Sequence, residues 1–115
     1  MDYRSALALQ RLRHAPVPDA VCFHAEQCAE KYLKAVLLLH TVPPQRTHAL
    51  SALNDLLKTV LPAARSLDLD CALLQQFAVE VRYPGASATG FEAQMAIASM
   101  RRIRRFARRA LGAQS

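Results

Sequence analysis

Glycine, tryptophan and long apolar runs are scarce in this chain of 115 residues. Only three glycines occur and no tryptophan, whereas alanine, leucine, glutamine and arginine, which lose little side-chain freedom in a helix, are abundant. The longest apolar run, residues 35–39, is far shorter than the roughly 20 residues that span a bilayer. The composition therefore predicts a helical domain and argues against a membrane protein.

Cysteine is also too sparse to build a scaffold. The three cysteines, Cys22, Cys28 and Cys71, are odd in number and form no close pair, which argues against a disulfide framework and against a zinc site. We expect them to be small buried side chains. The N-terminus carries Asp2 at once and has no apolar core like that of a secretory signal. We therefore expect a cytoplasmic protein with no metal and no other cofactor.

What the chain does have is enough apolar material for one core and an excess of positive charge. Hydrophobic residues make up 52% of the sequence, and its length fits one domain covering residues 1–115. The formal net charge is +6, and six arginines fall within nine residues near the C-terminus: Arg101, Arg102, Arg104, Arg105, Arg108 and Arg109. Such a cluster suits phosphate or an acidic protein surface.

A purely structural interpretation of these arginines competes with the functional one. Cations near the C-terminal end of a helix offset the negative end of its dipole, which explains some of the arginines without any ligand. Phe106 is the only aromatic residue among them, so base stacking is not supported. A protein that packs nucleic acid by charge alone is a further alternative.

Hydrophobic periodicity and proline breaks divide the chain into helices. We predict helices over residues 2–13, 19–40, 48–61 and 91–110, and a further helix within residues 63–82 that is clearest from Cys71 onward. Loops at Pro16 to Pro18, Pro43-Pro44, Pro62 and Pro84-Gly85 separate them. Asp19 and Thr47 are the expected N-caps, and Gly112 is the expected C-cap of the last helix. No segment alternates with period two, so no sheet is expected.

The helix over residues 19–40 has the clearest amphipathic pattern. One broad arc is apolar, and the opposite arc holds His24, Glu26, Gln27, Glu30, Lys31 and Lys34. Glu30 stands four residues before Lys34, the favourable order for an ion pair along a helix. The apolar arc is expected to face the core and the polar arc to face solvent.

Three segments in order are the most specific feature of the sequence: FHAEQCAEKYLKA at 23–35, THAL at 47–50 and RYPG at 82–85. Together they resemble the HEPN family (higher eukaryotes and prokaryotes nucleotide-binding). The resemblance implies an all-α, up-and-down bundle of four to five helices that forms a homodimer. It also implies a prokaryotic two-component, toxin–antitoxin-like system in which the partner is a minimal nucleotidyltransferase, and binding of nucleotide, RNA or that partner protein.

Several branches of that family are metal-independent endoribonucleases with an arginine followed, after four to six residues, by a histidine. Arg82 takes the place of this arginine, but positions 87 to 89 are Ser87, Ala88 and Thr89. None of the four histidines has an arginine five to seven residues before it. RNA cleavage needs a proton acceptor with a pKa near neutrality, which arginine does not provide. The sequence therefore predicts a binding module without ribonuclease activity.

The alternative is a divergent endoribonuclease that uses Arg82 at a dimer interface, with Tyr83 or His24 of a facing subunit handling the proton. In either case the residues expected to bind nucleotide or RNA are Arg82, Tyr83, Lys31, Lys34, His24, Arg46, His48, Arg101, Arg104, Arg105 and Arg108.

Each of these residues also has a structural interpretation. His24 fits an ordinary boundary histidine bonded to backbone or water. Lys31 and Lys34 fit an ion-paired, solvated face, and His48 fits a local hydrogen bond at a helix start. The Arg82 to Pro84 segment fits the end of a helix, where a proline stops it.

Overall fold

All the regular secondary structure in the described part of the chain is helical. The computed structural model describes residues 18–43, 45–80 and 88–112. In order, it contains helix α2 (Pro18–Leu39), helix α3 (Leu50–Val60), the 3-10 helix η1 (Pro62–Leu67), helix α4 (Asp68–Glu80) and helix α5 (Gly90–Ala110). No strand occurs within these residues, which confirms the all-α prediction. The helix expected over residues 2–13 lies outside the described ranges.

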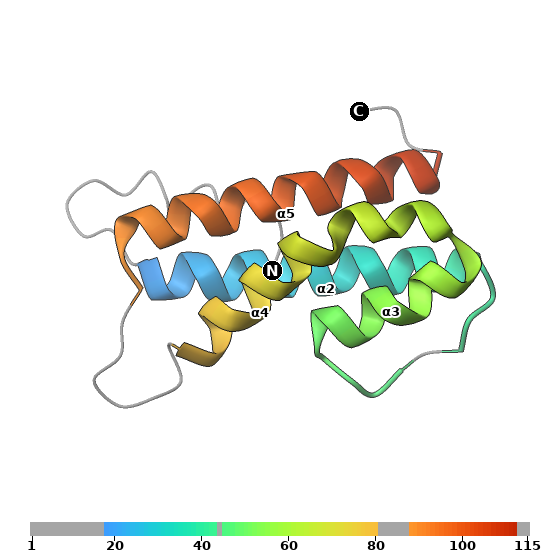
Figure 1. The fold of residues 1–115 in the computed structure, drawn as a ribbon, viewed down its shortest axis with the longest axis horizontal. Helices are drawn as coiled ribbons and strands as arrows, with labels where there is room; N and C mark the ends of the chain where they lie inside the picture. The colour runs from blue at the N-terminus through green and yellow to red at the C-terminus, as the bar shows by residue number, and fades with distance from the viewer. Residues whose placement is uncertain (1–17, 44, 81–87, 113–115) are drawn as a thin grey trace.

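Helices α2 and α5 form the long axis of the bundle and run side by side in the same direction (Figure 1). The segment between α2 and α3 leads back along α2, so α3 begins beside the middle of α2 (Figure 1). The chain then reverses through η1 and α4; α4 packs against both long helices, whereas η1 packs against α5. This path brings the start of α3 close to the centre of α2, where the candidate site lies.

One core joins all the helices, and it follows the predicted apolar stripes. The most deeply buried side chains of α2 and α5 include Ala25, Ala29, Leu33, Val36, Ala96, Met100, Ile103 and Ala107. The small alanines let the two long helices approach closely. Leu50, Leu53 and Leu57 of α3 are fully buried as well. The core thus contains the apolar faces expected from helical periodicity.

All three cysteines are buried, as predicted. Burial raises the pKa of the Cys71 thiol to about 12, and the nearby Asp70 carboxylate adds to this effect. A thiol in this environment stays protonated at neutral pH and is a poor nucleophile. Cys71 therefore serves as a small apolar side chain.

The helix ends differ from the predictions at several positions. Thr47 is not the N-cap of α3: the cap is Ala49, whose N–H donates to Thr47 Oγ1 at 3.1 Å. Asp19 lies inside the first turn of α2, where its carboxylate accepts a hydrogen bond from the Ala88 N–H. It therefore links two distant segments instead of capping a helix.

The last helix has a better-defined beginning than the sequence suggested. Thr89 and Glu92 form a capping box in which each side chain accepts from the other residue's backbone N–H, at 3.0 and 2.9 Å. At the other end the C-cap is Leu111, one residue before the predicted position. Gly112 follows it with φ of 77°, the left-handed conformation that favours glycine.

The helix predicted within residues 63–82, clearest from Cys71 onward, is α4, which begins at Asp68; the residues before it form the 3-10 helix η1. Asn54 of α3 is fully buried and holds this junction. Its Nδ2 donates to the Ala64 carbonyl at 3.0 Å and to Asp68 Oδ1 at 2.9 Å. The polar group thus fixes three successive elements against one another.

Candidate anion-binding face

The centre of the candidate site is Glu30, a carboxylate that the structure buries. The polar arc of α2 was expected to face solvent, but Glu30 is only 8% exposed and Glu26 only 5%. That prediction is wrong for both glutamates. Glu30 is covered where the segment before α3 returns along α2, since His48 of that segment contacts it. A buried carboxylate is costly unless it is paired.

Glu30 is paired twice on one oxygen. Its Oε2 accepts from Lys34 Nζ at 2.8 Å, which confirms the predicted ion pair along the helix. The same oxygen lies 2.7 Å from Nδ1 of His48, which comes from the segment just before α3. The other oxygen, Oε1, is buried and accepts no hydrogen bond within the described part of the chain.

These contacts favour the ionised form of Glu30. Burial raises the pKa of Glu30, but the hydrogen bonds and charges of Lys34 and His48 outweigh it, so this pKa lies below its ordinary value. Because an ionised carboxylate only accepts hydrogen bonds, Nδ1 of His48 is the donor. The His48 side chain is 75% exposed, so its second ring nitrogen, Nε2, can be reached from solvent.

Two more cations lie next to this pair. Lys31 adjoins Glu30 in the chain, one turn before Lys34, and Arg46 lies two residues before His48; both are exposed. We call Lys31, Lys34, Arg46 and His48 the cationic cluster. The buried Glu30 positions two of its members, and the remaining charge faces outward, so the cluster can accept an anionic ligand or an acidic protein surface.

His24, another expected site residue, does not join the cationic cluster. It lies seven residues before Lys31 on α2, which places it about 10 Å further along the helix axis. Its half-buried ring packs edge-on against Phe23 with the ring centroids 5.7 Å apart. This arrangement supports the structural interpretation of His24.

The arginine-rich helix α5 presents a second cationic surface on its outer arc. Arg101, Arg102, Arg105 and Arg109 are exposed, whereas Arg104 and Arg108 lie at the half-buried edge of the helix. Arg108 and Arg109 fall in the last turn, where they offset the helix dipole. The exposed arginines therefore leave a positive surface beyond what helix stability requires.

One arginine of this group has a structural role that the sequence did not reveal. Arg102 Nε donates to Asp70 Oδ1 at 2.8 Å, and Asp70 is only 5% exposed. The pair joins α5 to α4 across 32 residues of sequence. The only sequence signal was an acidic residue at a position that the helical pattern of α4 places inward.

The remaining expected site residues, Arg82 and Tyr83, lie outside the described residues. Within the described ranges no group of three or more histidine, cysteine, aspartate or glutamate side chains is placed to hold a metal ion. In the same ranges, each helix is too short or too polar to cross a membrane.

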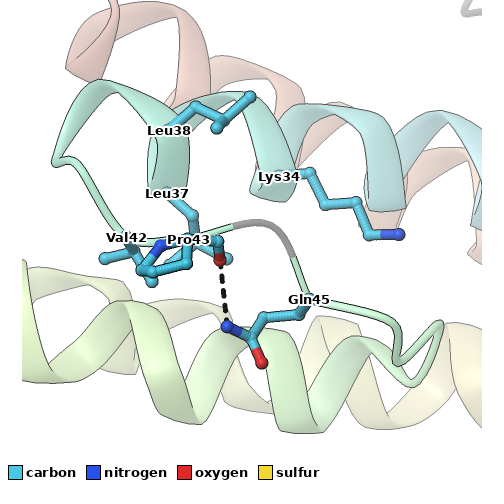
Figure 2. Close-up of a pocket in the computed structure, with 6 residues that line it drawn as sticks. All are labelled: Lys34, Leu37, Leu38, Val42, Pro43 and Gln45. Atoms are coloured by element: carbon cyan, nitrogen blue, oxygen red, sulfur yellow. Dashed lines mark hydrogen bonds between the residues drawn. The ribbon is translucent and has the colours of Figure 1, made fainter.

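A small pocket adjoins the cationic cluster where α2 ends. It has a volume of about 90 Å³ and is lined by Lys34, Leu37, Leu38, Val42, Pro43 and Gln45 (Figure 2). It is almost entirely apolar apart from the side chains at its edge.

The fold and the site define a small all-α bundle with one group of basic side chains beside α2 and another on α5. The family model of the HEPN domain matches residues 6–110. The chain therefore belongs to the HEPN domain family. No curated protein and no solved structure matches it. Two of the three segments that carried the resemblance meet in the structure, since Glu30 and Lys34 belong to the first and His48 to the second.

Proposed function

We propose that this chain is the HEPN module of a prokaryotic two-component, toxin–antitoxin-like system and that it acts by binding, in the cytoplasm and as a homodimer. Its partner protein is a minimal nucleotidyltransferase, and its small ligand is a nucleotide or RNA. The observation that carries the proposal is the cationic cluster, which is ordered by a buried carboxylate from the family segments themselves.

The physical argument for a binding role rests on where the charge lies. The Glu30 carboxylate neutralises one positive charge, while Lys31 and Arg46 stay at the surface. The chain has a formal net charge of +6, so its long-range field attracts acidic macromolecules. We assign the partner protein to the cationic cluster, and nucleotide or RNA to the outer arginines of α5.

Co-purification with the product of the neighbouring open reading frame tests the partner assignment. We expect a stable complex at micromolar concentration, and at least a tenfold weaker one for the double variant Lys31→Glu, Arg46→Glu. Arg65→Glu is a matched control, because it reverses an exposed charge on η1 outside the cluster. If no complex forms with the wild type, the proposed partner is wrong. If Arg65→Glu weakens the complex as much as the double variant does, the cationic cluster is not the binding surface.

Fluorescence anisotropy with a labelled RNA tests the assignment to α5. Replacing Arg101, Arg105 and Arg109 together by glutamine should weaken binding and reduce its salt dependence by about three counterions. The same three substitutions should leave the protein complex intact. Unchanged RNA affinity in the triple variant overturns this part of the proposal.

The pair of Glu30 and His48 favours a second candidate, the divergent endoribonuclease. A carboxylate on Nδ1 orients the imidazole and leaves Nε2 to take the proton of a ribose 2′-hydroxyl, whose oxygen attacks the adjacent phosphorus. The bond from phosphorus to the 5′-oxygen then breaks, the leaving 5′-oxygen takes a proton from water, and Arg82 of the dimer stabilises the phosphorane. Wild-type protein should then cleave RNA, and His48→Ala and Arg82→Ala should each lower the rate about 10²-fold or more. His40→Ala is the control. Equal cleavage by all variants indicates contamination.

A further inference from the structure

The pocket at the end of α2 is built by the turn that follows the helix. Leu37 and Leu38 come from the last turn of α2, and Val42, Pro43 and Gln45 come from the segment that leads back towards α3 (Figure 2). We call it the turn pocket.

Hydrogen bonds hold the walls of the turn pocket in place. The Val42 N–H donates to the Leu37 carbonyl at 2.9 Å, and Gln45 Nε2 donates to the Pro43 carbonyl at 2.9 Å (Figure 2). Thr41 has φ of 59°, which is unusual for a residue with a side chain, and its N–H donates to the Leu38 carbonyl at 3.0 Å. The pocket is therefore preformed, and a ligand does not have to order it.

The turn pocket combines an apolar interior with a cationic edge. Leu38 is 56% exposed, which leaves a large apolar surface open at its mouth. The Lys34 side chain lines one side, while its ammonium group points away from Leu38 and Pro43, towards the bond with Glu30 (Figure 2). Its carbon stem thus contributes apolar surface. Two further cations are near neighbours of lining residues in the chain, since Lys31 lies one turn before Lys34 on α2 and Arg46 follows Gln45.

The size and lining decide what kind of group fits. A volume of about 90 Å³ is smaller than the roughly 150 Å³ of a cavity that accommodates benzene, so a branched aliphatic side chain fits better than an aromatic ring. None of the lining side chains is aromatic, so a nucleobase finds no surface on which to stack. The occupant is therefore a protein side chain and not RNA.

We propose that the turn pocket binds a leucine, isoleucine or valine side chain of a partner protein, from a short segment in which this residue is flanked by aspartate or glutamate. The aliphatic side chain fills the pocket, and the flanking carboxylates pair with Lys31 and Arg46. This inference rests on the proposed function, since it describes the segment by which an acidic partner engages the cationic cluster.

Two-dimensional amide NMR of the full chain with synthetic peptides tests the pocket directly. The probe is the blocked pentapeptide Glu-Glu-Leu-Glu-Glu, compared with Glu-Glu-Ala-Glu-Glu and Lys-Lys-Leu-Lys-Lys. We expect the first peptide to shift the amide signals of Leu38, Thr41 and Val42, and to bind at least tenfold more tightly than either of the others. Equal binding of the alanine peptide shows that charge alone acts, and it overturns the inference.

A matched pair of leucine variants keeps the test independent of folding. Leu38→Ala removes one wall of the pocket and should lower the affinity for the leucine peptide at least tenfold. Leu69→Ala, on α4, removes a leucine that is 71% exposed and should leave the affinity unchanged. Equal effects of the two variants contradict the proposal, and thermal melting checks that both variants fold.

The peptide and the whole partner separate this inference from the proposed function. If the leucine peptide binds the turn pocket but no complex forms with the neighbouring gene product, the inference about the pocket is supported and the partner assignment is contradicted. If that complex forms and Leu38→Ala leaves its affinity unchanged, the partner assignment stands and the turn pocket is overturned.

Discussion

Asp70 and Glu30 are two of the buried carboxylates in the described part of the chain, and each is bound by basic side chains. A comparison of the two distinguishes a contact that packs helices together from one that organises a surface. Asp70 is 5% exposed and binds one side chain, Arg102, which joins α4 to α5. Glu30 is 8% exposed and binds Lys34 and His48 through one oxygen. The first pair connects two helices within the bundle, whereas the second orders a surface whose charged groups reach solvent.

The largest effect is expected from breaking the packing pair. Arg102→Ala leaves Asp70 buried without its counter-charge, and such losses cost about 3–5 kcal/mol when both partners are buried. Because the Arg102 side chain is 51% exposed, we expect a smaller loss of unfolding free energy, about 2–3 kcal/mol. Urea unfolding followed by circular dichroism measures it.

Arg105→Ala is the control for this comparison, since it removes an exposed arginine from the same helix. Its unfolding free energy should change by about 0.5 kcal/mol or less. If Arg102→Ala is no more destabilising than Arg105→Ala, the contact with Asp70 does not contribute to the free energy of unfolding.

A smaller effect is expected when one partner of Glu30 is removed. His48→Ala should cost less than about 1 kcal/mol, because Lys34 still neutralises the carboxylate and the His48 side chain is largely exposed. A double-mutant cycle between Glu30→Ala and His48→Ala should give a coupling energy of about 0.5–1 kcal/mol. A coupling of zero would mean that the 2.7 Å contact does not order the surface.

The same comparison shows which features the sequence predicts. The apolar stripes of α2 and α5 repeat with the helical period over many turns, so the fold class and most core residues followed from pattern alone. Neither buried carboxylate followed from that pattern. A helical pattern records polarity but not whether a partner lies nearby, and His48 and Arg102 are 18 and 32 residues away from their carboxylates.

At the start of α3, the local capping preference of Thr47 did not decide where the helix begins. Thr47 has the side chain of an N-cap, yet α3 begins two residues later than such a cap would set, and His48 contacts α2 instead of starting a helix. The Glu30–Lys34 pair was predictable, because it depends only on a spacing of four residues. The contacts of Glu30 were therefore predicted where they are local, with Lys34, and missed where the chain folds back, with His48.

The smallest expected effect is the contribution of Glu30 to the dependence of stability on pH. Its pKa is lower in the folded protein than in the unfolded chain, so unfolding takes up a proton as the pH falls. The stabilisation is fully present above the ordinary pKa of 4.5 and is lost as the pH falls below it, through the lower folded value. Between pH 6 and pH 3, Glu30→Gln should therefore lose less stability than the wild type does.

Asp68 provides the internal reference for this measurement. The hydrogen bond from Lys58 lowers its pKa too, so part of the acid dependence should persist in Glu30→Gln and disappear only when Asp68→Asn is added. Urea midpoints at successive pH values measure both contributions. If Glu30→Gln follows the wild-type curve at every pH, Glu30 is not held ionised by Lys34 and His48, and the cationic cluster loses the element that orders it.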